Sequence, residues 1–191
     1  MVSYDVSSLF TNIPLTEVIH IILNKLFHNN TPFVNFSYDL FKKLLETASL
    51  NCYFLFNKSI YQQVDGIAMG SPLGPTFANI FMCHLEQNFL DNCPSEHKPT
   101  LYRRYVDDTF ALFESKSHAE AFFKYINTIH PNIKFTLEHE KDNKLPFLDV
   151  EVNRTQNGFS TSVFRKPTFT SLSTNFLLPS TQFNTSHYTS Y

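Results

Sequence analysis

The sequence contains no tryptophan, only four glycines and three cysteines, and no long run of apolar residues. Cys52, Cys83 and Cys93 are odd in number and form no C-x-x-C pair, which argues against a disulfide scaffold or zinc cluster and favours a reducing compartment. Residues 1–10 lack the basic and apolar segments of a secretory signal, and no stretch approaches the roughly 18 apolar residues that span a membrane. We therefore expect a nuclear or cytoplasmic protein, neither secreted nor bound to a membrane.

Charged residues are also scarce, at 17% of 191 residues against roughly 25% in an average domain. Hydrophobic residues reach 42%, with 21 Phe and 9 Tyr, which excludes intrinsic disorder and predicts one domain or slightly more. Residues 1–151 hold 12 Lys and Arg and 17 Asp and Glu, whereas residues 152–191 hold three basic residues and no acid. An acidic body with a basic end is compatible with a metal site and a phosphate-contacting surface, and equally with chance fluctuation.

Apolar periodicity predicts helices that alternate with hairpins. The predicted helices cover residues 15–27, 40–48, 78–89 and 117–129. Ser37 is expected to cap the second helix, and a capping box of Ser117 and Glu120 is expected to open the fourth. The predicted strands cover residues 2–6, 52–56, 59–63, 101–106, 109–113, 133–139, 145–152 and 159–164. Helices and antiparallel hairpins that share one sheet indicate an α+β fold.

The pair Asp107-Asp108 is predicted to form a tight turn between two strands, and Asp is common in turns because it caps backbone amides. Adjacent carboxylates also repel, and a divalent cation between them and phosphate oxygens relieves that repulsion. Asp5 ends the first strand, 102 residues before Asp107. A two-metal phosphoryl-transfer site needs two or three carboxylates on adjacent strand ends. Asp5 and Asp107 meet this requirement if their strands are neighbours.

Three segments, in this order, resemble the motifs of reverse transcriptases. Residues 4–14 (YDVSSLFTNIP) are similar to motif A, residues 65–79 (DGIAMGSPLGPTFAN) to motif B and residues 105–108 (YVDD) to motif C. Together with PFLD at 146–149 and FRKPT at 164–168, the sequences of these motifs resemble those of the Penelope-like retroelements. The resemblance implies a polymerase palm, an antiparallel sheet packed on helices, over residues 1–167. Residues 168–191 would begin a poorly ordered connection from palm to thumb.

The resemblance also implies a role for each matching residue. Asp5 and Asp107 would bind two Mg²⁺ ions, which Mn²⁺ can replace, with Asp108 as a supporting third carboxylate. Phe10 would be the steric gate beneath the sugar 2′ position, and an ordinary core role is its alternative. The other nucleotide-binding residues would present backbone amides to the triphosphate or shape the pocket: Ser7, Ser8, Leu9, Gly70, Ser71 and Pro72.

Further implied contacts involve an RNA template, a DNA primer and deoxynucleoside triphosphates. Tyr105 and Val106 would lie near the primer end, and Arg165 and Lys166 would belong to the primer-grip side of the palm.

A motif D lysine is expected to protonate the departing pyrophosphate. Lys134, Lys141 and Lys144 compete for this role, and we favour Lys144. Arg103 and Arg104, on the strand before the YVDD turn, face either nucleic acid or solvent.

The match departs from the family in some respects. Met69 stands where many reverse transcriptases carry Gln, a substitution that is usual in the Penelope-like type. The sequence begins four residues before Asp5, so the fingers residues that clamp the triphosphate are missing, as are the thumb and the GIY-YIG-type endonuclease of the parent polyprotein. We therefore expect that the isolated chain does not extend a primer.

The predicted function is that of a fragment of an RNA-directed DNA polymerase, which transfers nucleotides to a primer 3′ end with two metal ions. The alternative, from a different class, is a catalytically silent retroelement remnant with at most weak nucleic-acid binding. The intact Asp5, Asp107 and Asp108 favour descent from an active enzyme. A nucleotide cyclase is a weaker alternative because its glycine-and-acid hairpin signature is absent.

Overall fold

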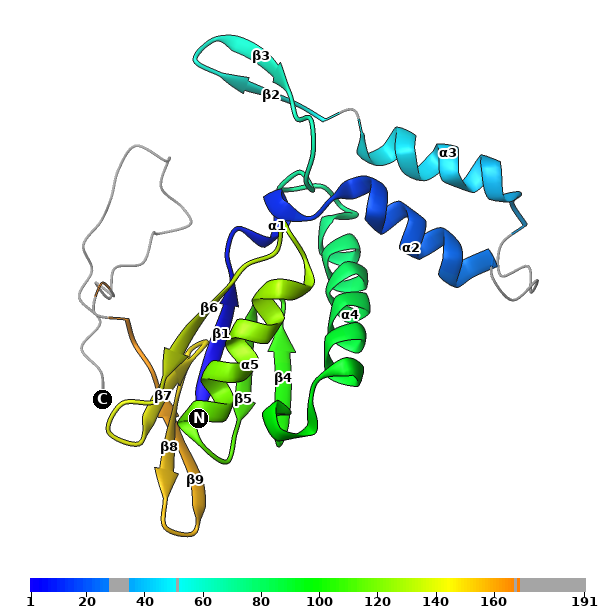
Figure 1. The fold of residues 1–191 in the computed structure, drawn as a ribbon. Helices are drawn as coiled ribbons and strands as arrows, with labels where there is room; N and C mark the ends of the chain where they lie inside the picture. The colour runs from blue at the N-terminus through cyan, green and yellow to red at the C-terminus, as the bar shows by residue number, and fades with distance from the viewer. Residues whose placement is uncertain (28–34, 51, 167, 169–191) are drawn as a thin grey trace. The chain divides into compact units, whose positions relative to one another are not determined.

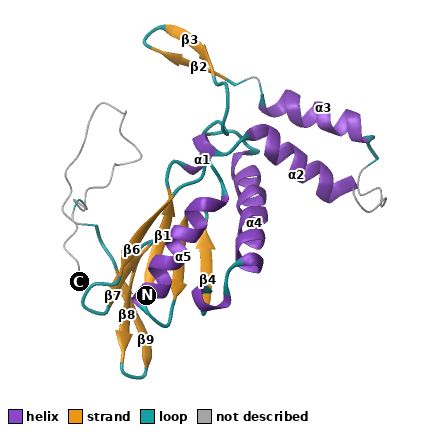
Figure 2. Ribbon diagram, in the orientation of Figure 1, coloured by secondary structure: helices purple, strands orange, loops and turns teal. Residues whose placement is uncertain are grey.

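The computed structural model describes residues 1–27, 35–50, 52–166 and 168 (Figure 1). The chain divides into two compact units, Met1–Lys141 and Asp142–Tyr191. The first unit combines helices with a four-stranded sheet and a two-stranded hairpin, and the second contains a three-stranded sheet (Figure 2). The predicted α+β class is confirmed, but the hairpins form three separate sheets instead of sharing one.

The main sheet places the first strand of the chain between two later ones. Its order is β4-β5-β1-β6, and its antiparallel strands are β1 (Val2–Val6), β4 (Leu101–Tyr105), β5 (Asp108–Leu112) and β6 (Phe135–His139). Val2, Tyr4 and Val6 are buried, whereas Asp5 is exposed. Because side chains alternate along a strand, Asp5 points away from the core that the other three enter.

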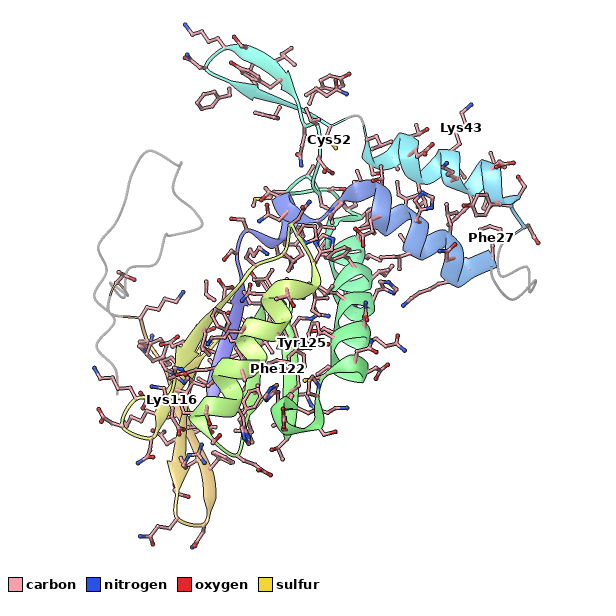
Figure 3. All side chains as sticks on the ribbon, viewed as in Figure 1. Phe27, Lys43, Cys52, Lys116, Phe122 and Tyr125 are labelled. Carbon is pink, nitrogen blue, oxygen red and sulfur yellow. The ribbon has the colours of Figure 1, made fainter. Side chains whose placement is uncertain are left out.

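Helices α4 and α5 pack on the buried face of this sheet. The helices of the first unit are α1 (Leu9–Asn12), α2 (Leu15–Phe27), α3 (Tyr38–Ser49), α4 (Gly74–Asn92), the 3-10 helix η1 (Ser95–His97) and α5 (Lys116–Ile129). The ring of Phe89 on α4 lies 5.9 Å from that of Tyr102 on β4, and the ring of Phe122 lies 5.8 Å from that of Tyr4. Phe122 is labelled on α5 in Figure 3. The Tyr4 hydroxyl donates a hydrogen bond to the Ala119 carbonyl, which satisfies its polar atom inside the core.

Capping side chains decide where two of these helices begin. Ser37 caps α3, as predicted. Helix α5 begins one residue before the predicted range because Ser115, and not Ser117, caps it, accepting a hydrogen bond from the His118 amide at 3.2 Å. The predicted capping box of Ser117 and Glu120 is therefore wrong, although both residues lie in the predicted helix.

Two hairpins belong to the first unit. One is a sheet by itself, with a turn at residues 57–58 as predicted, and its strands are β2 (Tyr53–Phe56) and β3 (Ser59–Gln62). In the other, β4 and β5 are joined by Val106 and Asp107, because Asp108 already pairs with Tyr105. The predicted turn at Asp107-Asp108 is thus displaced by one residue.

The second unit is a meander of three short strands. These are β7 (Lys144–Phe147), β8 (Val150–Thr155) and β9 (Gly158–Val163). The single strand predicted over 145–152 is wrong, because Leu148 has a φ of +56° and turns the chain between β7 and β8. The prediction for 168–191 lies outside the described residues except for residue 168.

Candidate active site

Three aspartates lie on adjacent stretches of backbone where β1 runs beside β5. Asp5 lies directly opposite Asp108 in the antiparallel register, and the Val6 amide donates to the Asp107 carbonyl at 3.1 Å. Burial and, to a lesser extent, the charge of Asp107 raise the pKa of the Asp5 carboxyl. The negative charge of Asp107, in the turn before β5, therefore acts on the carboxyl of Asp5 on the neighbouring strand β1.

The turn that carries Asp107 has an unusual backbone. Val106 has a φ of +56°, a value that β-branched residues rarely adopt because of steric strain. The Arg104 guanidinium donates from Nη1 to the Val106 carbonyl at 2.9 Å. This hydrogen bond braces the strained turn and so helps to fix the backbone position of Asp107.

Arg104 also ties the turn to helix α4. Its Nε lies 2.6 Å from Glu86 Oε1, and the two side chains are only 8% and 13% exposed. The Tyr102 hydroxyl donates to the same Glu86 oxygen at 2.9 Å, and Arg104 Nη2 donates to Asn79 at 3.2 Å. Burial opposes the charge of the guanidinium, but hydrogen bonding and charge from Glu86 outweigh it and raise the pKa of Arg104. Arg104 thus faces α4, while Arg103 is exposed.

The segments that resemble motifs A and B are joined by a second set of contacts. Asp65 Oδ1 accepts hydrogen bonds from the Leu15 amide at 3.2 Å and the Gly66 amide at 2.8 Å. A Cβ atom on Gly66 would lie 2.6 Å from the Thr11 carbonyl oxygen, and its φ is +81°. Only glycine fits this close approach at this backbone conformation. The loop is therefore held against α1 and the start of α2.

Phe10 lies next to this junction. Its carbonyl accepts a hydrogen bond from the Ile67 amide at 2.7 Å, and its half-buried ring packs beside Gly74 at the start of α4. A Cβ atom on Gly74 would lie 3.7 Å from Phe10 Cε1. The ring is thus neither fully in the core nor free in solvent, and both the gate and the core interpretation remain compatible with its position.

The other predicted nucleotide-binding residues lie on two short segments. The Ser7 amide donates to the Lys134 carbonyl at 2.8 Å, so it is already paired. Ser8 has a left-handed backbone with φ +50° and leads into α1, where Leu9 is buried. The segment of Gly70, Ser71 and Pro72 forms the turn before α4, with the Ser71 amide donating to the Ala68 carbonyl at 3.1 Å.

The predicted nucleic-acid contacts are distributed over both units. Tyr105 and Val106 are exposed beside Asp107, at 63% and 41%. Arg165 and Lys166 are exposed residues that follow β9 in the second unit.

The three candidate lysines differ in their surroundings. Lys134 donates from Nζ to the Asn127 and His130 carbonyls, near the end of α5. Lys144 lies in the second unit and pairs with Glu151 at 3.1 Å. Lys141 ends the first unit and is exposed.

The carboxylates of Asp5, Asp107 and Asp108 are the candidate ligands for a metal ion. In the parts of the chain that the structure describes, no three His, Cys, Asp or Glu side chains gather closely enough to hold an ion. Two observations bear on a shared cation: the charge of Asp107 acts on the Asp5 carboxyl, and Asp108 lies directly opposite Asp5 in the strand register. Hard carboxylate oxygens of this kind are the ligands that Mg²⁺ and Mn²⁺ prefer.

Sequence reasoning missed the bracing residues. Asn79, Cys83 and Glu86 follow at spacings of four and three residues on α4, which places them in one line along the helix. This polar line on a largely apolar helix was the available signal for a buried partner such as Arg104. Asp65 gave no such signal, because its hydrogen bond reaches a residue 50 positions away.

An antiparallel sheet that sets paired aspartates on adjacent strands, with two helices on its other face, is the palm architecture of nucleotide polymerases. The family model described as reverse transcriptase (RNA-dependent DNA polymerase) matches residues 1–172. The chain belongs to the reverse transcriptase family. No curated protein matches its sequence significantly.

Solved telomerase structures share the fold. An apo telomerase from Candida tropicalis, truncated from the C-terminal domain, has a TM-score of 0.60 at 14% identity, covering 84% of this chain and 35% of that one. A telomerase from Candida albicans, in complex with a TWJ fragment of telomeric RNA, has a TM-score of 0.58 at 13% identity, covering 80% and 29%. The chain spans about a third of the length of these structures. None of its described helices is long and apolar enough to cross a membrane.

Proposed function

We propose that the chain is the palm of an RNA-directed DNA polymerase from a Penelope-like retroelement, which adds deoxynucleotides to a DNA primer on an RNA template. Family membership supports the reaction class, and the amino-acid sequence of residues 4–14, 65–79 and 164–168 supports the retroelement type. The observation that carries the proposal is the meeting of Asp5 and Asp107 between β1 and the β4–β5 turn.

In this proposal Asp5 and Asp107 hold two Mg²⁺ ions, or Mn²⁺ in their place, and Asp108 adds negative charge from the position opposite Asp5. Such ions supply activation of the primer hydroxyl and neutralisation of the triphosphate. The protein contributes mainly position and electrostatics. Arg104, which is bound to the Val106 carbonyl, keeps the Asp107 turn in place for this role.

The nucleotide would lie between α1 and the turn before α4. We assign the amides of Ser8 and Leu9 to the triphosphate, and leave the Ser7 amide aside because it is paired with Lys134. Phe10 would close the space beneath the sugar 2′ position. The turn of Gly70, Ser71 and Pro72 would complete the pocket.

Four exposed residues are assigned to the primer and template. Tyr105 and Val106, exposed beside Asp107, would lie near the primer end, and Arg165 and Lys166 would contact the nucleic-acid backbone. Lys144, which pairs with Glu151 at 3.1 Å within the second unit, is our choice for protonating the pyrophosphate.

A metal-binding experiment tests the proposal without requiring a complete polymerase. Titration of the chain with Mn²⁺, followed by electron paramagnetic resonance, should show binding that tightens when a deoxynucleoside triphosphate is added. Asp5→Asn and Asp107→Asn should each weaken Mn²⁺ binding at least about tenfold, because each removes a direct ligand. Asp91→Asn, an exposed position on α4, is the matched control and should change nothing. A wild-type chain that binds no Mn²⁺ would favour the silent remnant.

The gate is tested by Phe10→Ala in a polymerase-active protein that contains this palm. If Phe10 excludes the 2′ hydroxyl by a clash, ribonucleotide incorporation should rise at least about tenfold, or 1.4 kcal/mol in relative barrier, with deoxynucleotide use near normal. Phe77→Ala, at a buried position of the same α4 junction, is the control and should lower the use of both substrates together. Equal loss of both substrates in Phe10→Ala would assign Phe10 to the core.

A further inference from the structure

The β2–β3 hairpin exposes apolar side chains on both of its faces. Phe56 is 68% exposed, Leu55 71% and Ile60 75%. A hairpin of two four-residue strands is only marginally stable in water by itself. Large apolar surfaces that stay exposed on a folded unit mark binding sites more often than chance, so the question is which partner this surface fits.

The two faces differ in their chemistry. The pairing places Phe54 opposite Tyr61 and Leu55 opposite Ile60, and side chains alternate along each strand. Phe54, Phe56 and Tyr61 therefore share one face, and Leu55 and Ile60 share the other. The ring centroids of Phe54 and Tyr61 lie 5.7 Å apart in a stacked arrangement, so the aromatic face presents flat rings instead of aliphatic knobs.

The start of the hairpin borders a cavity beside the candidate active site, where Phe54 belongs to the aromatic face and Tyr53 to the opposite face. This cavity of about 260 Å³ is lined by Tyr53 and Phe54 of the hairpin, by Thr11 of α1 and by Met69 of the segment resembling motif B. Its volume is several times the roughly 30 Å³ that a water molecule occupies in the liquid. Thr11 follows Phe10, so the cavity and the hairpin continue directly from the region assigned to the nucleotide.

We propose that the Phe54, Phe56 and Tyr61 face is a stacking platform for unpaired bases of a single-stranded nucleic acid, which continues from Phe54 toward the cavity at Met69. The inference rests on the proposed polymerase function, because that function brings a single strand to this region. Bases stack on exposed aromatic rings largely without regard to sequence, which suits a strand of arbitrary sequence.

Charge and size favour this occupant over a protein. Lys58, at the turn, is the only charged residue between positions 52 and 64, and its charge is complementary to phosphate. Strands of four residues are about 14 Å long and two strands about 10 Å wide. That face is much smaller than the roughly 800 Å² that each partner buries in a standard protein interface. About four bases stacked at about 3.4 Å match its length.

The test measures binding of fluorescently labelled single-stranded oligouridine and oligodeoxythymidine to the whole 191-residue chain by anisotropy. The triple variant Phe54→Leu/Phe56→Leu/Tyr61→Leu keeps an apolar face but removes the rings, and should weaken binding at least about tenfold, since stacking of each base contributes substantially. The matched control, Leu55→Ala/Ile60→Ala on the opposite face, should change binding less than about twofold. Circular dichroism verifies that both variants fold.

A second measurement does not depend on any variant. An oligonucleotide that contains 2-aminopurine should lose fluorescence on binding the wild-type chain, because stacking on a ring quenches this base. Unchanged affinity in the triple variant, equal loss in both variants, or unquenched 2-aminopurine would overturn the inference. So would a wild-type chain that dimerises through this face and binds no single strand, as judged by sedimentation.

The experiment also separates this inference from the proposed function. Asp5→Asn/Asp107→Asn should abolish Mn²⁺ binding but leave single-strand binding within about twofold of wild type. Ring-dependent strand binding in a chain that binds no Mn²⁺ would reject the polymerase proposal alone. Mn²⁺ binding without ring-dependent strand binding would reject the platform alone.

Discussion

The core under the main sheet and the β2–β3 hairpin use the same kinds of side chain for opposite purposes. In the core, Tyr4, Phe89 and Phe122 are almost fully buried and their rings contact one another. In the hairpin, Phe54 and Tyr61 also contact each other but remain about half exposed. The two clusters therefore differ in what covers them, and ring content alone does not distinguish them.

The difference shows what an apolar run in the sequence can mean. The segment YFLF at 53–56 has the continuous apolar pattern that is typical of a strand buried on both faces, yet both of its faces are exposed. Strand β1 has a weaker, alternating pattern and contributes three buried residues. No helix among the described residues covers the hairpin, whereas β1 lies beneath α4 and α5. Burial is decided by tertiary neighbours that the local pattern does not contain.

The largest expected effect is the loss of a core ring. Phe89→Ala should lower the free energy of unfolding by about 3–5 kcal/mol, because it removes a buried ring and leaves a cavity. Phe56→Ala in the hairpin is the matched control, and it should lower it by less than about 0.5 kcal/mol, as exposed positions do. Urea unfolding of both variants measures the difference. Similar losses at the two positions would show that the hairpin is covered in solution and would break the comparison.

The elements were predictable where a periodic pattern and a local cap agree, as in α3 after Ser37. The neighbouring placement of Asp5 and Asp107 is predicted from the family resemblance and the chemistry of a two-metal site, and not from local sequence patterns, because strand order depends on packing between distant segments. Arg104 could not be oriented from the sequence, since its partners come from α4. Leu148 and Val106 have positive φ values, which are rare for these residue types. The strands therefore end at other residues than the sequence predicts.

A second comparison contrasts a buried ion pair with an exposed one. Arg104→Ala should cost about 3 kcal/mol of unfolding free energy, because it leaves the Glu86 carboxylate largely buried without its cation. Lys42→Ala, which removes an exposed pair with Glu46 on α3, should cost less than about 1 kcal/mol. Adding Glu86→Gln to Arg104→Ala should recover part of the loss in urea unfolding. No recovery would mean that the loss comes from packing and not from the unpaired charge.

Two glycines allow the same contrast for the backbone. Gly66→Ala should lower the free energy of unfolding by about 2 kcal/mol or more, because the new Cβ would meet the Thr11 carbonyl oxygen at 2.6 Å at a φ of +81°. Gly70→Ala has a similar φ of +88° but nothing within 4 Å of the new Cβ, and should cost only about 1 kcal/mol. Thermal unfolding of both variants separates the cost of the clash from that of the conformation. Equal costs would show that the loop moves away from α1 without penalty.

The smallest effect concerns Asp5, which lies at the exposed side of the sheet next to Asp107. Its pKa is raised above the usual 3.8 by burial and by the charge of Asp107, so the folded state binds a proton more tightly than the unfolded state. Stability contributed by this group is therefore greatest at low pH and falls as pH rises through the raised pKa. At pH 7, without divalent cations, Asp5→Asn should melt slightly higher than wild type, within the ~2–4 °C that 1 kcal/mol produces in a chain of this size. The difference should vanish near pH 3, where Asp5 is protonated in both states.

Mg²⁺ should raise the melting temperature of the wild type and not of Asp5→Asn, because only the wild type keeps both carboxylates. Asp91→Asn should follow the wild type at every pH and Mg²⁺ concentration. A variant that melts below the wild type at pH 7 would show that the Asp5 carboxylate stabilises the fold, and that its repulsion with Asp107 is not the dominant effect.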